Sequence, residues 1–356
     1  MISMHLQHTW KSILIGSLAV YRCWAQASSA SAAQLKDIVP RPLSPDAFPQ
    51  NVADCHAINR VTGEEKSIQI HYVDINPQAN KTIIMVHGWP SLWHSWKYQI
   101  EAFKDDYHLI VPDLRGFGQS THPGDVQNSG TMPDMVGDLV CTLKHAGISK
   151  ALCVGHDWGT QYLPYNGPYA PIDDLLEEMP KLSYNVYFER MTNQAIHELN
   201  TDIRRTLRAT LRSMASPPPD AFLQQTDSFL QGWDDMPGSD TFQALNFYTY
   251  GNQYASREIA HAQGNFTIPQ PALSILSSGD PVANWSLAAT LMKSEEFVPH
   301  LTTKSVDAAH WLQLEKPDEV NAIMKEWLEQ WYPPVSDIPA TQDTTNTQSE
   351  HARDEL

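Results

Sequence analysis

The chain has 356 residues, of which 42% are hydrophobic, and its 41 acidic and 24 basic side chains give a formal charge of −17. Such a charge argues against binding to nucleic acid or to an anionic membrane surface. The length allows one large domain with a substantial core and an inserted cap.

Residues 1–30 have the layout of a secretory signal peptide. They contain Lys11 and Arg22 but no acidic residue, and an apolar stretch over 12–21 precedes a group of small residues. The stretch is too short to span a bilayer, which takes about 20 apolar residues. We therefore predict a leader that directs the chain into the secretory pathway.

The first part of the core is expected within residues 31–164. Residues 82–86 and 109–112 are short, apolar runs typical of buried strands. The first run ends in His-Gly-Trp-Pro at 87–90, and a backbone N–H just after such a strand can help to bind an oxyanion. The predicted donor is the amide of Trp89.

The sequence Gly-His-Asp-Trp-Gly at 155–159 follows a third apolar run and is typical of a nucleophile elbow, a sharp turn from strand to helix. Its central residue, Asp157, would attack carbon as a carboxylate and leave an ester on the enzyme. The amide of Trp158 is the second predicted oxyanion donor. The alternative is an ordinary turn at the end of a strand, with an incidental acid.

The segment after the elbow differs from the helix that normally follows such a turn. Pro164, Gly167, Pro168 and Pro171 follow within a few residues and cannot continue a helix. We predict that the elbow helix and the following strand are truncated. The loss of that strand would leave an open edge in the sheet.

A helical cap is predicted over residues 165–265, and the second part of the core over 266–332. In the second part, Asp280 follows the apolar run 271–276 and His310 follows the run 302–306. The order nucleophile, acid and histidine is the chain order of α/β-hydrolases. We predict that His310 is the general base and that Asp280 orients it.

Four segments, 87–90, 113–120, 155–159 and 307–321, resemble characteristic segments of epoxide hydrolases in the α/β-hydrolase superfamily. The resemblance covers roughly residues 50–332 and implies an α/β-hydrolase fold, with a mostly parallel sheet and an inserted helical cap. It also implies two cap tyrosines that hold the epoxide oxygen. The matching positions are Tyr184, with Tyr187 as its nearest competitor, and Tyr248.

The resemblance implies hydrolysis of a small, apolar epoxide to a vicinal diol, with water as the second substrate and neither metal nor organic cofactor. The intermediate would be an ester of Asp157, hydrolysed by water that His310 and Asp280 activate. One alternative is a haloalkane or haloacid dehalogenase, which shares the Asp nucleophile and in which Trp158 could serve to hold the halide. The other is an inactive, hydrolase-derived binding protein, because of the missing segment.

The polar tail, residues 333–356, is predicted to be disordered. It ends in Arg353, Asp354, Glu355 and Leu356, which resemble a retrieval signal of the endoplasmic reticulum. We expect the tail to bind a retrieval receptor and the protein to reside in the lumen of that compartment. Glycosylation sequons begin at Asn80, Asn265 and Asn284.

Outside the leader, the chain has three cysteines, Cys55, Cys141 and Cys153. This odd number gives no disulfide framework. Cys141 and Cys153 lie in apolar patterns, so we expect both to be buried thiols.

Overall fold

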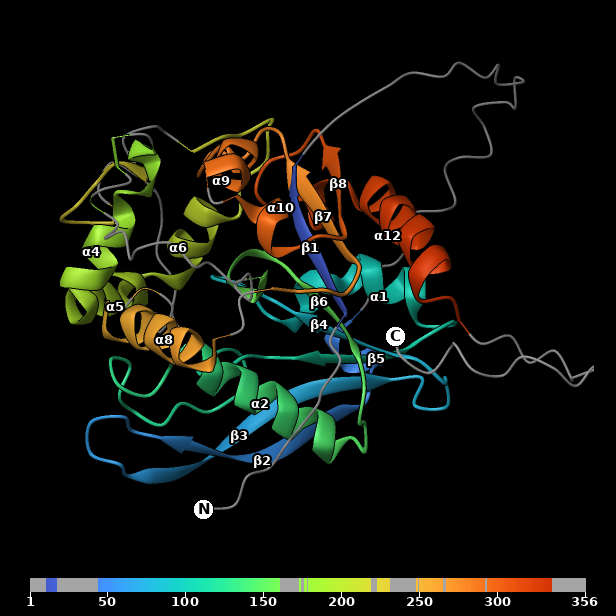
Figure 1. Ribbon diagram of the computed structural model, residues 1–356. Helices are drawn as coiled ribbons and strands as arrows, with labels where there is room; N and C mark the ends of the chain where they lie inside the picture. The colour runs from blue at the N-terminus through green and yellow to red at the C-terminus, as the bar shows by residue number, and fades with distance from the viewer. Residues whose placement is uncertain are drawn as a thin grey trace, which may run out of the picture.

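The computed structural model describes residues 11–17, 44–160, 173, 176–177, 179–218, 223–230, 248, 250–264, 267–291 and 293–334. Its centre is an eight-stranded sheet of order β2-β3-β5-β4-β6-β1-β7-β8 (Figure 1). The strands are β1 (Lys11–Ser17), β2 (Gln50–Ile58), β3 (Glu65–Ile75), β4 (Thr82–Val86), β5 (His108–Pro112), β6 (Leu152–Gly155), β7 (Ala272–Ser277) and β8 (Leu301–Val306). The pairs β2–β3 and β3–β5 are antiparallel and the other described pairs are parallel, which confirms the predicted mostly parallel sheet.

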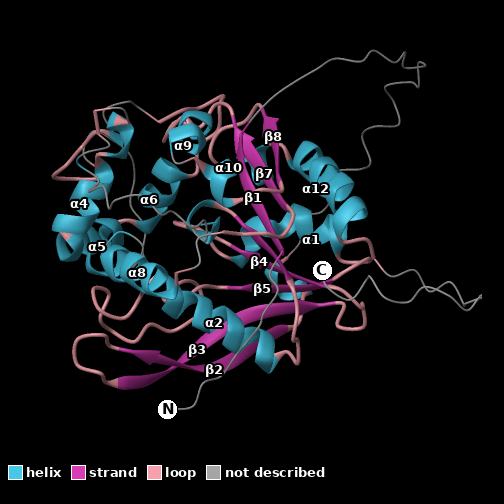
Figure 2. Ribbon diagram, viewed as in Figure 1, coloured by secondary structure: helices cyan, strands magenta, loops and turns pink. Residues whose placement is uncertain are grey.

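Helices cover both faces of the sheet (Figure 2). The α-helices are α1 (Lys97–Phe103), α2 (Met132–His145), α4 (Tyr184–Arg190), α5 (Thr192–Thr201), α6 (Ile203–Thr210), α8 (Tyr250–Gln263), α9 (Trp285–Leu291), α10 (Ser294–Phe297), α11 (Leu312–Glu315) and α12 (Pro317–Trp331). Four 3₁₀ turns are described as well: η1 (Pro45–Ala47), η2 (Trp93–Trp96), η3 (Asp157–Thr160) and η4 (Pro180–Leu182). None of these described helices combines the length and the apolar character that crossing a membrane requires.

The alternation of side chains along β4 explains how one sheet supports two hydrophobic cores. Ile84 and Val86 belong to a core that includes Leu139 of α2. Ile83 and Met85 belong to the opposite core, which contains buried residues of α1 and α12. Successive strand residues point to opposite faces, so a strand buried on both sides is mostly apolar, as β4 is after Thr82.

The strand beside β6 comes from an unexpected part of the chain. Lys11–Ser17, within the predicted leader, forms β1 between β6 and β7. Ile13 is in register with Val154 on one side and with Leu273 on the other. The open edge expected beside β6 is therefore occupied, but by residues that precede the core and not by residues that follow the elbow. The chain after Thr160, where truncation is predicted, lies outside the described residues up to 173. Cleavage of a leader stays a prediction.

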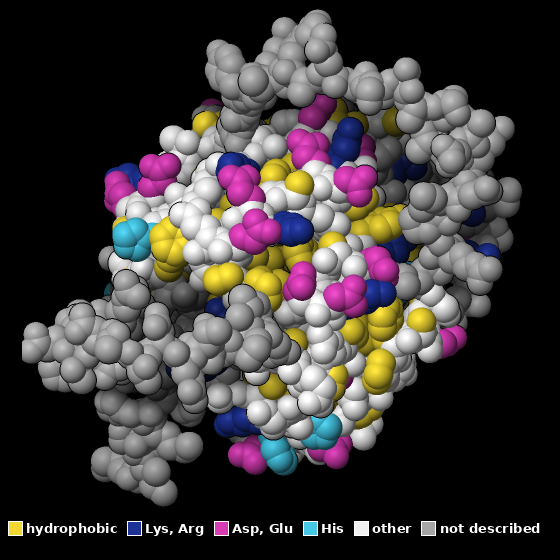
Figure 3. All heavy atoms as spheres, turned by 90° about the vertical axis from the view of Figure 1, so that its right-hand side faces the viewer, with side chains coloured by type: hydrophobic (Ala, Val, Ile, Leu, Met, Phe, Trp, Pro, Cys, Tyr) yellow, Lys and Arg dark blue, Asp and Glu magenta, His cyan; other side chains and the backbone are white. Residues whose placement is uncertain are grey.

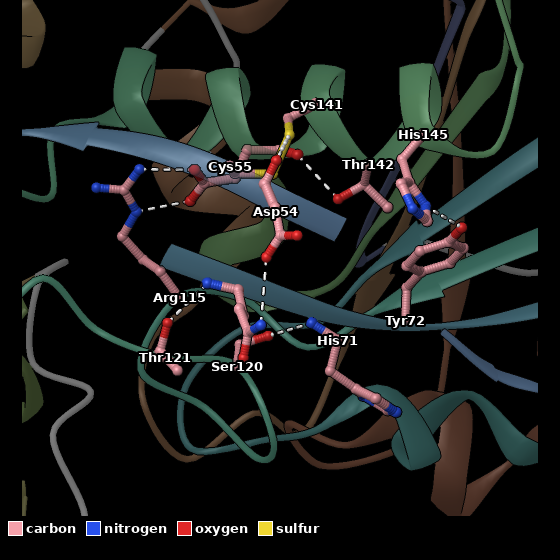
Figure 4. Close-up of a disulfide and its surroundings, with 12 residues drawn as sticks. Asp54, Cys55, His71, Tyr72, Arg115, Ser120, Thr121, Cys141, Thr142 and His145 are labelled. Carbon is pink, nitrogen blue, oxygen red and sulfur yellow. Dashed lines mark hydrogen bonds and ion pairs between the residues drawn. A yellow bond between two sulfur atoms is a disulfide. The ribbon is translucent and has the colours of Figure 1, made fainter. Parts of the chain in front are cut away.

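The expectation that Cys141 is a free thiol is wrong, because Cys141 forms a disulfide with Cys55 (Figure 4). The bond joins the edge strand β2 to α2, and the two Cα atoms lie 6.0 Å apart. An odd number of cysteines does not exclude a single pair. The remaining described cysteine, Cys153, is a buried free thiol, as expected.

Further contacts fix α2 over the sheet. The hydroxyl of Tyr72 in β3 lies 2.9 Å from Nδ1 of His145 at the helix end (Figure 4). The buried guanidinium of Arg115 binds both carboxylate oxygens of Asp138, at 2.6 and 2.7 Å. The first turn carries a capping box, in which Thr131 accepts from the amide of Asp134 and Asp134 accepts from that of Thr131. Such caps satisfy amides that the helix itself leaves unpaired.

The described helices α4, α5, α6 and α8 lie within residues 165–265, where a helical cap is predicted. A break at Asp202 separates α5 from α6, and its carboxylate accepts the amide of Arg205 at 2.9 Å, which caps α6. On the side of the molecule that carries α12, acidic and basic side chains lie among hydrophobic ones (Figure 3). Ion pairs there, such as Lys304–Glu326 at 3.7 Å, are exposed and contribute little to stability.

Candidate active site

The predicted nucleophile elbow has the backbone that such a turn requires. Asp157 begins η3 directly after β6, with φ at 54°, in the left-handed region that non-glycine residues rarely adopt. A Cβ atom on Gly155 would overlap the carbonyl oxygen of Gly159. A Cβ atom on Gly159 would in turn overlap that of Val86 in β4. The two glycines therefore allow the turn to pack against β4, and the turn holds Asp157 at the carboxyl end of the sheet.

Asp157 lies between two of its predicted partners. The amide of Trp89 donates to Oδ1 at 2.7 Å. Oδ2 lies 3.3 Å from Nε2 of His310. The second predicted donor, the amide of Trp158, belongs to the next residue of η3. About 15% of the Asp157 side chain is exposed, so it is neither sealed in the core nor free on the surface.

The structure also brings Asp280 and His310 together. Nδ1 of His310 lies 2.7 Å from Oδ2 of Asp280. That carboxylate accepts two further bonds, from the indole N–H of Trp285 at 2.5 Å and from the amide of Val282 at 2.8 Å. Burial would raise the pKa of Asp280, but His310 and these donors lower it below its ordinary value. Asp280 is therefore an anion that holds the Nδ1–H tautomer and leaves Nε2 toward Asp157.

The two carboxylates control the charge of His310. Burial alone would lower its pKa, but Asp280 and Asp157 outweigh burial and raise the pKa to about 10. Without substrate, His310 is thus an imidazolium between two anions at neutral pH. Neutralising either carboxylate would remove part of this electrostatic effect and lower the pKa of His310.

His156, which the sequence did not single out, anchors the backbone of His310. Its Nε2 lies 2.8 Å from the carbonyl oxygen of His310, so this nitrogen must carry the proton. Burial and the neighbouring His310 lower the pKa of His156 to about 4, which keeps the ring neutral. The only signal in the sequence was the position itself, immediately before the predicted nucleophile.

The predicted tyrosines lie over Asp157. Tyr184 begins α4, Tyr248 follows from a later part of the cap, and both are buried with ring centroids 6.1 Å apart. Burial raises the pKa of both hydroxyls, and the charge of Asp157 raises it further, so both keep their protons. The competitor Tyr187 instead hydrogen bonds to Glu198, inside the cap. Of the two α4 tyrosines, Tyr184 is the one placed to act with Asp157.

Aromatic side chains surround this position. The ring of Trp89 contacts Phe188, Phe229 and Tyr248, with centroids 5.2, 5.6 and 5.4 Å away. Trp93 packs on the opposite side of the sheet and does not join them. Trp233 and Phe247 lie outside the described residues.

The sites predicted for modification and retrieval are described only in part. Asn80 and Asn284 are exposed. Asn265 and the terminal residues Arg353, Asp354, Glu355 and Leu356 lie outside the described residues. Among the residues that are described, no group of three or more His, Cys, Asp or Glu side chains could hold a metal ion.

Comparisons with known proteins agree with this geometry. A family model described as the alpha/beta hydrolase fold matches residues 81–162. Solved epoxide hydrolases from Mycobacterium thermoresistibile and Vigna radiata superimpose with a TM-score of 0.60, at 21% and 18% identity. They cover 80% and 81% of this chain and 100% and 99% of their own. The chain has the α/β-hydrolase fold.

Relatives found by sequence are named as epoxide hydrolases. Epoxide hydrolase A of Mycobacterium tuberculosis is 27% identical over 317 residues, which cover 74% of this chain and 95% of that protein. Bifunctional epoxide hydrolase 2 of Sus scrofa is 24% identical over 308 residues, which cover 74% of this chain. The chain spans only 53% of the length of the pig protein. The match thus extends well beyond the elbow and into the region of the cap.

Proposed function

We propose that the protein hydrolyses a small, apolar epoxide to a vicinal diol through an ester of Asp157. The position of Asp157 carries the proposal: this side chain lies between the amide of Trp89 and Nε2 of His310, and its charge acts on both Tyr184 and Tyr248. A carboxylate nucleophile, a base and proton donors are the groups that a two-step opening of an epoxide needs.

In the first step, a carboxylate oxygen of Asp157 forms a bond to one ring carbon while the bond from that carbon to the epoxide oxygen breaks. The electron pair moves to the oxygen, which takes a proton from a cap tyrosine. This tyrosine is left as an anion. His310 can return the proton through solvent, because its pKa falls once Asp157 has become a neutral ester.

In the second step, neutral His310 takes a proton from water, and the water oxygen attacks the carbonyl carbon of the Asp157 ester. The amides of Trp89 and Trp158 would hold the resulting oxyanion. The bond from the acyl carbon to the product oxygen then breaks, and this oxygen takes the second proton of the attacking water. The diol leaves, and the carboxylate of Asp157 is restored beside the imidazolium of His310. The sum of the two steps is epoxide plus water giving diol, with every proton accounted for.

The cap supports an epoxide over a halide. A dehalogenase of this kind uses N–H groups to hold the departing halide, and the indole of Trp158 is the candidate here. That indole N–H instead donates to the hydroxyl of Tyr248. Two protonated tyrosines suit the oxygen of an epoxide, which accepts protons as the ring opens. The inactive alternative is disfavoured by the short contacts that join Asp157, His310 and Asp280.

The location in the lumen of the endoplasmic reticulum is part of the proposal. The predicted leader and the terminal residues Arg353–Leu356 motivate it. The Cys55–Cys141 disulfide and the exposed sequons at Asn80 and Asn284 are compatible with an oxidising lumen.

The test is direct detection of the ester. Replacing His310→Gln should allow one reaction with an aryl or alkyl epoxide and then block the second step. Intact-mass analysis should show one substrate mass added, on a peptide that contains Asp157. The native protein, turned over in heavy-oxygen water, should acquire label in Asp157. If the native protein forms diol but His310→Gln acquires no adduct, water attacks the epoxide directly and the ester mechanism is wrong. If neither reacts with any epoxide, the proposed function is wrong.

A further inference from the structure

The carboxylate of Glu315 joins two segments that lie far apart in the sequence. One of its oxygens accepts the amide of Ala309 at 2.9 Å, and the other accepts the amide of Met214 at 3.1 Å. Ala309 directly precedes His310, the predicted base, whereas Met214 follows α6 in the predicted cap. Glu315 itself is the last residue of α11, just before α12. A single side chain therefore links the backbone beside the base to the cap.

Two further contacts join the same part of the cap to the acid and the base. The indole N–H of Trp311, the residue after the base, donates to the carbonyl oxygen of Thr210 at 2.8 Å. Met214 lies against Gly279, the residue before the acid, because a Cβ atom on this glycine would lie 2.9 Å from the sulfur of Met214. Residues 210–214 of the cap therefore contact the immediate neighbours of both groups.

The loop around His310 is held differently on its carbonyl and amide sides. Three core groups donate to its carbonyl oxygens within 3.0 Å: the hydroxyl of Ser277, the amide of Gly279 and Nε2 of His156. The amide of Ala309 donates to Glu315, whose carboxylate is shared with the amide of Met214. A displacement of the cap would therefore be transmitted through this carboxylate to the backbone next to His310.

Such a displacement would affect one chemical step more than the other. A general base acts only within hydrogen-bond distance of the proton that it takes. A misplacement of about 1 Å can slow a reaction about 100-fold. We propose that Glu315 is a positioning residue that couples the cap to His310 and thereby supports hydrolysis of the ester. The attack of Asp157 on the epoxide does not use His310 as a base, so it depends little on this link. The inference rests on the function proposed above.

The test measures both chemical steps in Glu315→Gln and Glu315→Ala. The amide group of glutamine has one acceptor oxygen, and its nitrogen only donates, so the first variant loses one of the two bonds at nearly constant size. Loss of a hydrogen bond to a charged group should slow ester hydrolysis by about tenfold or more, while alkylation stays within about twofold of the native rate. The ester should then accumulate during turnover, as seen by intact-mass analysis. Equal slowing of both steps, or native rates in both, would overturn the proposal.

The cap end of the link can be removed alone. The α-hydroxy analogue of methionine at position 214 replaces the amide N–H by an ester oxygen and leaves the bond from Ala309 to Glu315 in place. It should slow ester hydrolysis as well. In a Glu315→Ala background it should cause no further loss, because both changes act through the same carboxylate. Native hydrolysis in the single variant, or additive losses in the double variant, would overturn the coupling to the cap.

The same analogue at position 191 is the matched control. Met191 and Met214 are exposed to a similar extent, 44% and 42%. The amide of Met191 donates to the carbonyl oxygen of Tyr187 at 2.9 Å, so this bond stays within the cap. The control should hydrolyse the ester at the native rate. Equal effects at the two positions would mean that any lost main-chain bond in the cap slows hydrolysis, and the role of Glu315 would be wrong.

The pKa of His310 gives a readout that a general loss of stability would not change. Two carboxylates raise it to about 10 in the free protein. If the base moves away from them, NMR titration of the Met214 analogue should show a lower pKa, although that variant keeps every charge of the chain. Asp125→Asn is the control for stability, because Asp125 accepts the amides of Gln127 and Asn128 at 3.0 and 3.2 Å, away from this link. It should keep the native pKa, and an unchanged pKa in the Met214 analogue would overturn the proposal.

The native protein decides the underlying function separately. If it forms no adduct on Asp157, the proposed function fails. If it forms the adduct, and the variants at positions 214 and 315 hydrolyse that adduct at the native rate, the proposed function stands and only the role of Glu315 is wrong.

Discussion

Nε2 of His310 lies 3.3 Å from Oδ2 of Asp157, so the predicted base contacts the predicted nucleophile directly. Asp157 and Asp280 together raise the pKa of His310 before a substrate arrives. Formation of the Asp157 ester in the proposed first step therefore changes the surroundings of His310, the base of the second step.

The first prediction concerns the pH dependence of the two steps. In the free protein, the pKa of His310 is about 10. Once Asp157 is an ester, one of the two anions that raise this pKa is gone. The rate of ester hydrolysis should then rise with pH through an apparent pKa well below 10, because neutral His310 is required. Single-turnover measurements at several pH values, with histidine titration by NMR in the free protein, would check both values. Ester hydrolysis that begins only above pH 10 would contradict the argument.

The raised pKa of His310 in the free protein also affects its stability. A histidine whose pKa is raised on folding stabilises the native state fully below its unfolded pKa, about 6.5, and this contribution is lost as pH rises through the folded value. The free energy of unfolding should therefore decline between about pH 6.5 and 10. His310→Gln should flatten that part of the curve, as measured by chemical denaturation. An equal decline in both proteins would assign the effect to other groups.

The Cys55–Cys141 disulfide should contribute measurably to stability. It closes a loop between residues 86 apart in sequence, and such bonds are worth about 2–4 kcal/mol. The double replacement Cys55→Ser with Cys141→Ser should lower the free energy of unfolding by about that amount. Cys153→Ala removes a buried thiol that is not bridged and serves as the control. Labelling of Cys55 by a thiol reagent in the unreduced, denatured protein would show that the bond does not form.

The proposed location is tested at the tail. A tagged protein with its own ends should be retained in the endoplasmic reticulum. Deletion of Arg353–Leu356 should release it into the medium, because a retrieval receptor would lose its signal. A control with the same four residues in scrambled order should be released as well. Retention of the shortened protein would leave the retrieval proposal without support.

The strand β1 gives a prediction about the N-terminus. Ile13→Pro removes a backbone N–H from a strand that pairs on both sides, where proline is not tolerated. We expect a clear drop in the unfolding midpoint and loss of epoxide turnover. Ala30→Pro, outside β1, is the control and should behave like the native protein. An unchanged midpoint for Ile13→Pro would show that the sheet does not depend on this segment.

The positions of Asp157, Asp280 and His310 could be predicted from sequence because each follows a segment that is expected to form a strand. Parallel strands end at the same edge of a sheet, so residues after three such strands meet there. The choice between Tyr184 and Tyr187 could not be decided on residue type alone. It depends on Glu198, which lies on another helix and engages Tyr187.

Other features depend on long-range pairing that local patterns do not record. Only small residues of β2, Ala53, Cys55 and Ala57, point into the core, so the strand has little hydrophobic signal. For the same reason, the approach of Cys55 to Cys141 was not foreseen. The apolar run within residues 11–17 suits a leader and a buried strand equally well, and composition cannot separate the two.

The place of β1 in the sheet has a consequence for how the site is held together. Asp157 follows β6, whereas Asp280 and His310 follow β7 and β8. Among the described strands, β1 is the one that joins these two halves by hydrogen bonds. His310 and Asp157, which lie 3.3 Å apart, are therefore carried by two parts of the sheet that β1 joins. The residues of β1 are ones that a signal peptidase would remove. A protein that has lost its first thirty residues must find another strand for that position or let the two halves of the triad separate. Passage into the lumen and assembly of the site would then compete for one short segment.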